Sequence, residues 1–344
     1  MVTIKTIAQQ AGVSIATVSY VLNKSGNVSK ETTDKVLEVV KELDYKPNRV
    51  ARSLKVNRTQ TIGIIAEDIT VFNTPDIIDQ INNYAEENGY YVLLNNLRIY
   101  KRTHNNFEDV EKYMNEIVGI IDILLSHRVE GIIYIGCHSR EIKNMLEGIK
   151  IPIVFAYCFS NAENTYSIIN DEEFGGYQAT QYLIDKGHQS IGVITGLINS
   201  IITQDRLKGY QKAVMDHQLL FNPLHIKVGD WTYESGYRLG KELLVEAERP
   251  TAIFVMNDIM AGGVIDAAKE LNLGVPRDVS IIGFDNRECS FFYTPRLTTM
   301  ALPLEEMGRE AAKSLIQLIS KKKIDKNILK LRCKLVERNS VLEI

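Results

Sequence analysis

The sequence predicts a small all-α head followed by a larger α/β body. In the first 60 residues, apolar side chains recur at helical spacing between glycine, serine and proline breaks. From Thr61 onward, short apolar runs alternate with amphipathic stretches, as buried parallel strands alternate with helices. These runs are TIGIIA, YYVLL, GIIYIG, IPIVFA, SIGVITG, TAIFVM and VSIIGF. Because a chain of 344 residues leaves a body that is long for one sheet, we expect two doubly wound lobes.

The head is expected to hold three helices, each with a buried apolar stripe. The stripes are Ile4, Ile7, Ala8 and Ala11 in the first helix, Val18, Val21 and Leu22 in the second, and Val36, Val39, Val40 and Leu43 in the third. Gly12 can take the left-handed conformation of a tight turn. Ser14 and Ser29 can cap the second and third helices.

Two signals mark the domain boundaries. Pro47 ends the third helical pattern, and Asn48 can cap a short helix over the string RVARSLK. The polar run at residues 56–60 is typical of a linker. We therefore divide the chain into a helix-turn-helix head (1–47), a short helix and linker (48–60) and the body (61–344).

Charge is distributed unevenly between these parts. Residues 1–58 carry ten bases and five acids, whereas the rest of the chain carries 30 bases and 38 acids. A basic head on an acidic body suggests a polyanion as the partner of the head. The spacing of Ala8, Gly12 and Val18 is that of a helix-turn-helix, whose second helix enters a groove of DNA. The alternative is a generic three-helix bundle with a glycine turn.

Several longer strings point to a known family. The head carries TIKTIAQQAGVSIATVSYVLN and VSKETTDKVLEVVKELDYKPN, and the body carries QDRLKGY, GDWTYESGY, FVMNDIMAGG and VPRDVSIIGFDN. In these strings the chain resembles the lactose-repressor (LacI/GalR) family of bacterial transcription regulators over essentially its whole length. The resemblance implies a body with two lobes of the periplasmic-binding-protein type. It also implies a homodimer that binds a double-stranded DNA operator under the control of a small-molecule effector.

The resemblance assigns a set of head residues to DNA. The expected contacts are Lys5, Ser14, Ile15, Ala16, Thr17, Ser19 and Tyr20. In the family, the residues matching Ile15, Ala16 and Tyr20 read base edges in the major groove. None of these is Arg, Lys, Asn or Gln, so we expect modest direct readout and more specificity from DNA shape. The hydroxyl groups of Ser14, Thr17 and Ser19 are expected to bind phosphates.

Residues 48–55 resemble the hinge helix of the family. There the leucine matching Leu54 is pushed between two base pairs in the minor groove, at a cost on the order of a few kcal/mol. Arg52 and Lys55 flank this wedge and can neutralise phosphate. A lone short helix is marginal in water, so we expect the hinge to become ordered on DNA. The alternative is a disordered linker.

The body lacks the signatures of common enzymes. It has no G-x-G, no G-x-x-x-x-G-K-[ST] and no G-x-S-x-G string, and its histidines show no metal-ligand spacing. Cys137 and His138 are neighbours, but adjacent residues at a strand end point to opposite sides, so a thiolate pair is not expected. We expect a binding protein with no catalytic residues, no cofactor and no metal.

Polar and aromatic residues gather at the carboxyl ends of the expected strands, where doubly wound folds bind ligands. Arg206 follows the loop GLINSIITQD, and Asp258 can cap a helix. By resemblance to sugar-responsive members, Arg206, Asn257 and Asp285 hydrogen-bond sugar hydroxyls, and Trp231 stacks on the sugar ring. The expected effector-binding residues are Phe72, Pro75, Ile78, Tyr157, Arg206, Trp231, Asn257 and Asp285.

Two positions depart from the sugar-responsive pattern: a strand-end acid is Tyr157 here, and a later glutamine is Leu302. The purine-responsive pattern fits poorly as well, because Ser200 and Ile202 replace its Arg and Thr. We expect a small carbohydrate or sugar phosphate as the effector. A non-sugar ligand or a protein co-regulator remains open. A sugar-binding transport protein would need a signal sequence and no helix-turn-helix.

The remaining features concern the compartment. No stretch approaches the ~18 consecutive apolar residues of a membrane span, and the first residues lack the layout of a secretory signal. The four cysteines form no Cys-x-x-Cys pair, so neither a disulfide framework nor a zinc site is expected. The sequence therefore predicts a cytoplasmic protein without membrane contact.

Overall fold

The structure is a computed structural model and describes residues 2–22, 26–45, 58–103, 110, 112–143, 149–162, 165–322, 324 and 327–344. The chain divides into two compact units, Met1–Thr59 and Gln60–Ile344, and each is described by itself. The expected hinge residues Arg52, Leu54 and Lys55 lie outside the described residues. Their roles stay predictions.

The described residues of the head form three helices, as the apolar stripes predicted. They are α1 (Ile4–Ala11), α2 (Ile15–Leu22) and α3 (Lys30–Glu42). Gly12 follows α1 in the left-handed conformation, with a φ of 65°. The Ser29 hydroxyl accepts a hydrogen bond from the Thr32 amide at 3.2 Å and so caps α3. The helices share one core, formed by Ile7, Ala8, Ala11, Val18, Val21, Val36 and Val39.

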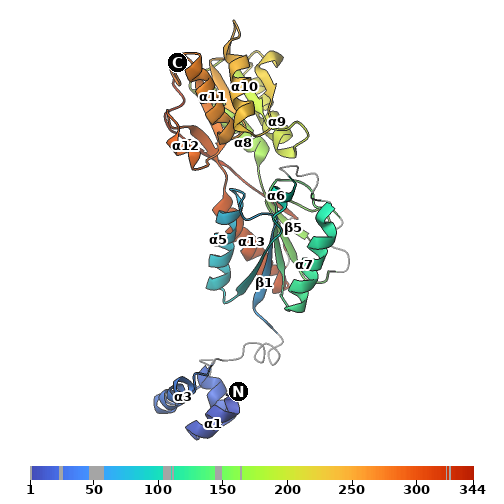
Figure 1. Cartoon of the computed structure of the whole chain (residues 1–344), viewed down its shortest axis with the longest axis vertical. Coiled ribbons are helices and arrows are strands. Elements are labelled where there is room, and N and C mark those ends of the chain that lie inside the picture. Colours follow the sequence, from blue (N-terminus) through green and yellow to red (C-terminus); the bar gives the residue numbers. More distant parts are fainter. Residues whose placement is uncertain are drawn as a thin grey trace. The chain divides into compact units, whose positions relative to one another are not determined.

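The body contains two six-stranded sheets, one in each lobe (Figure 1). The first has the order β11-β5-β4-β3-β1-β2, and its strands are β1 (Thr61–Ala66), β2 (Tyr91–Asn96), β3 (Ile132–Ile135), β4 (Ile153–Ala156), β5 (Thr165–Asn170) and β11 (Ile328–Leu331). The second has the order β12-β10-β9-β8-β6-β7, and its strands are β6 (Ile191–Thr195), β7 (Ile226–Val228), β8 (Ala252–Val255), β9 (Ser280–Asp285), β10 (Thr298–Ala301) and β12 (Lys334–Val336). The described pairings are parallel, apart from β10 with β12.

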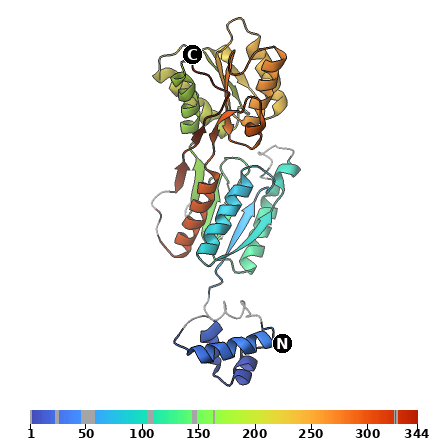
Figure 2. The same ribbon diagram turned by 90° about the vertical axis from the view of Figure 1, so that its left-hand side faces the viewer.

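Helices cover both faces of each sheet, which confirms the doubly wound architecture. The first lobe has α5 (Thr74–Glu87), α6 (Ile99–Arg102), α7 (Met114–Ser126) and α13 (Leu304–Ile319). The second has α8 (Glu172–Asp185), α9 (Ile201–Asp216), the 3-10 helix η2 (Pro223–His225), α10 (Tyr233–Leu244), α11 (Asp258–Glu270) and α12 (Cys289–Phe292). In the first lobe α5 packs against α13, on the sheet face opposite α7 (Figures 1 and 2).

The chain passes between the two lobes three times: after β5, after β10 and between β11 and β12. Each passage is a short segment, so the two lobes can open and close about it. Residues at or just after the carboxyl ends of β3, β4, β6, β8 and β9 line one cavity. Within the described residues, no helix is long and apolar enough to cross a bilayer.

The seven apolar runs coincide with β1, β2, β3, β4, β6, β8 and β9. Strand β1 shows why, because it is buried along almost its whole length between two layers of helices. Strand β5, whose Thr, Ser and Asn interrupt its apolar run, was not predicted, and neither were the short strands β7, β10, β11 and β12.

Candidate functional site

The outer face of α2 carries the residues expected to meet DNA. Ile15 and Tyr20 are about half exposed, at 52% and 51%, although both are large hydrophobic side chains. Ser14 and Ala16 are also exposed, whereas Thr17 and Ser19 are half-buried. Exposed apolar groups on a helix of this kind are suited to contact thymine methyl groups in a major groove. Lys5 is exposed on α1.

Local contacts hold this face in place. The Thr17 amide donates to Ser14 Oγ at 3.0 Å, so Ser14 caps α2 as expected. The Ser14 and Thr17 hydroxyls are 2.9 Å apart and share a hydrogen bond. A Cβ on Gly26 would lie 3.2 Å from Tyr20 Cγ, so this glycine lets the backbone support the tyrosine ring. The exposed side chains of Ile15 and Tyr20 are therefore presented on a helix whose first turn is capped.

In the body, a cavity of about 350 Å³ lies between the two lobes. We call it the effector cavity. It is lined by Val71, Phe72, Tyr100, Cys137, His138, Tyr157, Leu197, Ile202, Arg206, Asp230, Trp231, Thr232, Asn257, Ile259, Asp285 and Arg287. The lining follows strand ends in both sheets, which is where this architecture places ligands. The cavity brings together most of the expected effector-binding residues, with Phe72 and Tyr157 from the first lobe and Arg206, Trp231, Asn257 and Asp285 from the second.

Arg206 lies at the floor of this cavity and is almost fully buried. Its Nε donates to Glu172 Oε2 at 2.7 Å, and one guanidinium nitrogen donates to the Met256 carbonyl. A second guanidinium nitrogen is 3.5 Å from Asp285 Oδ1. The guanidinium also stacks on the Phe284 ring, 3.5 Å from its centroid. Arg206 lies within α9 rather than after a loop, because the preceding residues continue the helix.

Buried acids surround this arginine. Burial raises the pKa of Asp285 to about 7, although Arg206 acts in the opposite direction. The Tyr157 hydroxyl stays neutral, because burial and then the Asp285 charge raise its pKa well above the ordinary value. Near neutral pH, Asp285 can therefore accept or donate a hydrogen bond.

Asn257 and Trp231 form another part of the cavity wall. Asn257 Oδ1 accepts from the Met260 amide at 2.8 Å, so Asn257 caps α11 and Asp258 is the first helical residue. This corrects the expectation that Asp258 is the cap. Asn257 Nδ2 donates to the Trp231 carbonyl at 3.0 Å. The Trp231 backbone is left-handed, with a φ of 72°, and its indole packs directly on Gly196.

Asp258 lies behind the wall and is fully buried. Its two carboxylate oxygens accept from the Thr299 hydroxyl and the Arg287 amide, both at 2.6 Å. Burial and then Asp285 raise its pKa to about 8. Its contacts fix the segment that carries Arg287, whose guanidinium lies 4.7 Å from the Phe72 ring centroid in the other lobe.

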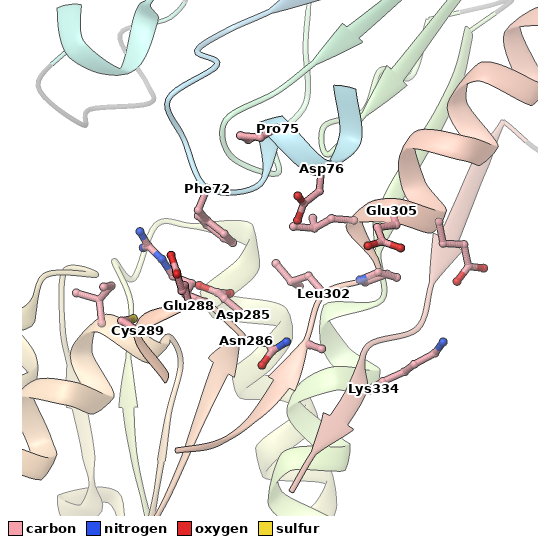
Figure 3. Close-up of a pocket in the computed structure, with 16 residues that line it drawn as sticks. Phe72, Pro75, Asp76, Asp285, Asn286, Glu288, Cys289, Leu302, Glu305 and Lys334 are labelled. Atoms are coloured by element: carbon pink, nitrogen blue, oxygen red, sulfur yellow. The ribbon is translucent and has the colours of Figure 1, made fainter. Parts of the chain in front are cut away.

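A second cavity of about 790 Å³ adjoins the first and shares Phe72, Ile259, Asp285 and Arg287 with it. Figure 3 shows Phe72 and Pro75 above it, Asp285 and Asn286 below it, and Leu302 near its centre. The expected residue Pro75 lines this second cavity and not the effector cavity. Ile78 lines neither cavity and packs half-buried against the core.

Sequence reasoning missed several lining residues. Cys137 and His138 were not expected to take part in the site, yet both line the effector cavity. Burial raises the pKa of the Cys137 thiol, so it is no thiolate. Their position directly after the run GIIYIG was the available signal, since strand ends carry the site in this fold. Tyr100 had no comparable signal because it lies in the short helix α6.

Comparisons with known proteins agree with this geometry. Residues 3–48 match the bacterial regulatory proteins of the lacI family, and residues 180–341 match a periplasmic binding protein-like domain. The HTH-type transcriptional repressor PurR of Edwardsiella ictaluri is 38% identical over 348 residues, which cover 100% of this chain and 98% of that protein. The PurR of Histophilus somni is also 38% identical, over 99% of each chain. The chain belongs to the lacI family.

Solved structures of the lacI family show the same architecture. The lac repressor dimer bound to operator and the anti-inducer ONPF has a TM-score of 0.78, with 29% identity over 99% of each chain. A complex of the transcriptional regulator CelR with cellobiose has a TM-score of 0.66 and 27% identity, covering 99% of this chain and 100% of that one. The protein is thus a DNA-binding repressor of the lacI family and not an enzyme.

Proposed function

We propose that the protein is a dimeric repressor whose operator affinity is set by a small neutral sugar in the effector cavity. The observation that carries the sugar assignment is the pairing of a polar floor with an aromatic wall. Arg206 and Asp285 offer a donor and an acceptor at the floor, and the half-buried Trp231 forms the wall. A sugar presents hydroxyl groups around its edge and C–H groups on its faces, so it matches both surfaces.

Charge favours a neutral ligand over a phosphorylated one. Two arginines line the effector cavity, but Arg206 is already bound to Glu172, and Arg287 lies over the Phe72 ring. Asp230 and Asp285 add two carboxylates to the lining. A phosphate entering here would meet these carboxylates, and because Glu172 already balances the charge of Arg206, the desolvation of the phosphate would be poorly repaid. A neutral hydroxyl needs no such balance and can accept from the N–H groups of Arg206 that are not used by Glu172, Met256 and Asp285. We therefore narrow the expected effector from a sugar or sugar phosphate to the neutral sugar.

A nucleobase is the competing ligand class. The two positions that depart from the purine-responsive pattern have specific surroundings in this structure. The Ser200 hydroxyl is 2.7 Å from His138 Nε2, and Ile202 lines the cavity with an apolar side chain. A base has several ring nitrogens and exocyclic groups to satisfy, and this corner supplies few partners.

The DNA partner follows from the head. The lac repressor structure is described as a dimer bound to operator, and we extend that arrangement to this chain. Two heads on one dimer read the two halves of a palindromic site. Ile15, Ala16 and Tyr20 would read base edges, while Leu54 would wedge open a base step. Because its partner is the bacterial genome, we place the protein in the cytoplasm.

A gel-shift assay tests the proposal. The full chain is incubated with genomic fragments, and the bound fragments are then challenged with neutral mono- and disaccharides, sugar phosphates and nucleobases. We expect a specific fragment to bind and a neutral sugar to change its affinity. A response to a nucleobase or a sugar phosphate alone would contradict the neutral-sugar assignment. If no fragment bound, the proposal that the protein recognises an operator would be wrong.

A further inference from the structure

A hydrogen bond between His138, which lines the effector cavity, and Ser200 joins the two lobes. His138 follows β3 in the first lobe, and Ser200 precedes α9 in the second. His138 Nε2 and Ser200 Oγ are 2.7 Å apart, which is the distance of a good hydrogen bond. The imidazole also meets the Trp231 ring edge-on, with the ring centroids 6.1 Å apart. The bond therefore lies beside the indole that forms the cavity wall.

Ser200 occupies a position whose side chain normally caps a helix. It is the N-cap residue of the 16-residue helix α9, with the extended backbone that a capping residue adopts. Yet its side chain makes no capping hydrogen bond. The N-cap residues of the neighbouring helices, Asp171, Thr232 and Asn257, each accept a hydrogen bond from their own helix.

The χ1 torsion angle of Ser200 decides between the hydrogen bond to His138 and the cap of α9. A serine has a single χ1 with three staggered rotamers, and the position that brings the Ser200 hydroxyl to His138 leaves it without a hydrogen bond to the first turn. In this structure it points toward His138, and the first turn of α9 lacks its cap. When the lobes separate, the hydroxyl is released and can rotate onto the amide of Ile202 or Thr203.

We propose that His138 is a positioning residue of the effector response, which holds the lobes closed by withdrawing Ser200 from the cap of α9. Closure gains this contact between the lobes and loses a cap, so the exchange offsets part of the free energy that favours closure. A smaller free-energy difference between the two states allows a ligand with a modest preference for one of them to shift the population.

The surroundings of His138 fit this role. Burial, and then the charges of Arg140 and Arg206, lower the pKa of the imidazole to about 3. The ring is therefore neutral in the closed state, and a neutral ring nitrogen can exchange a hydrogen bond with a hydroxyl. Arg140 is itself held by Glu67 in the first lobe. An effect of the His138–Ser200 contact on DNA binding rests on the proposed function. The exchange of the Ser200 hydroxyl between His138 and the cap of α9 does not.

Amide hydrogen exchange over residues 199–204 of the full chain, without ligand or DNA, tests the proposal. In His138→Ala, the released serine should cap α9, and the amides of Ile202 and Thr203 should exchange about fivefold more slowly. His138→Gln keeps a side chain that can bond Ser200 and should restore the wild-type rate. Ser200→Ala, alone or combined with His138→Ala, should abolish the slowing.

The direction of the change distinguishes this role from simple packing. If His138 only filled space, its removal would loosen the cleft, and these amides would exchange faster. Faster or unchanged exchange in His138→Ala would overturn the proposal, as would slowing that persists when Ser200 is alanine. Operator affinity is measured on the same samples with and without a sugar. If the exchange pattern is as expected but no sugar alters DNA binding, the positioning role stands and the proposed function fails.

Discussion

Arg206 Nε and Glu172 Oε2 are 2.7 Å apart, and both side chains are at least 95% buried in the floor of the effector cavity. A buried charge is tolerated only when it is paired, because its desolvation is costly. Each residue therefore depends on the other. The same guanidinium faces Asp285, so the pair also orients the group expected to meet the ligand.

The first prediction concerns this pair. Replacing Arg206 with methionine should destabilise the body by about 3–5 kcal/mol, because Glu172 would be left as an uncompensated buried charge. Adding Glu172→Gln should recover much of that loss. Urea unfolding followed by Trp231 emission measures both effects in a double-mutant cycle. Additive effects of the two substitutions would contradict the coupling.

A second prediction concerns the packing of Trp231. A Cβ on Gly196 would lie 2.0 Å from the indole Cζ2, so Gly196→Ala should expel the ring from its place. We expect a change in tryptophan emission and loss of ligand binding. Gly119→Ala is the matched control, because this helical glycine is exposed and a Cβ there meets nothing within 4 Å. It should add up to about 1 kcal/mol of stability. An unchanged emission spectrum in Gly196→Ala would show that the indole does not depend on the glycine.

The third prediction is a pH dependence. Burial raises the pKa of Asp258 to about 8 in the folded protein, from the ordinary value of 3.8 that the exposed acid has in the unfolded chain. Between these values the folded chain keeps a proton that the unfolded chain has released. The stability from this group is therefore full below about pH 4 and declines up to about pH 8.

Asp258→Asn removes this dependence. The stability of the variant relative to wild type should increase as the pH rises from 5 to 8, as measured by urea unfolding at several pH values. Asp278→Asn serves as the control, because the Arg277 hydrogen bond and then the Gly274 amide lower the pKa of this acid. It is ionised in both states over that range and should show a flat difference. A flat difference for Asp258→Asn as well would contradict the buried, protonated acid.

The fourth prediction separates affinity from specificity in the head. Log K for operator DNA should fall steeply with log[salt], since two basic heads displace counterions. Lys5→Ala should weaken binding to all sequences and reduce the slope by about one per head. Ile15→Ala should alter base preference at one position in each half-site and leave the slope unchanged. Equal slopes for wild type and Lys5→Ala would show that this lysine does not contact phosphate.

The sequence alone was enough to predict those parts of the fold that a residue determines through its own backbone or side chain. Gly12 and Ser29 terminate and start helices through their own backbone and side chain, and both do so in the structure. Strand β1 was predictable because burial on both faces demands a continuous apolar run. Strand β5 was not, because its Thr, Ser and Asn interrupt the apolar run, and one of its two neighbours in the sheet is β11, which lies far away in the sequence.

The effector cavity illustrates the same limit. Arg206 and Asp285 could be proposed from their types and their place near strand ends. Their partner Glu172 could not, because its proximity depends on how α8 packs against α9. The Ser200 contact with His138 joins residues of two lobes and is invisible to any local pattern. Contacts of this kind arise only when the tertiary structure brings distant elements together.

Ligand binding between the lobes and DNA binding by the heads should be coupled, and a pair of titrations tests this coupling. Operator affinity is measured with and without a saturating neutral sugar, and sugar affinity is measured through Trp231 emission with and without saturating operator. Linkage requires both ratios to be equal, and we predict the same factor, of about 5 to 150, in each. A sugar that binds and leaves operator affinity unchanged would contradict the coupling.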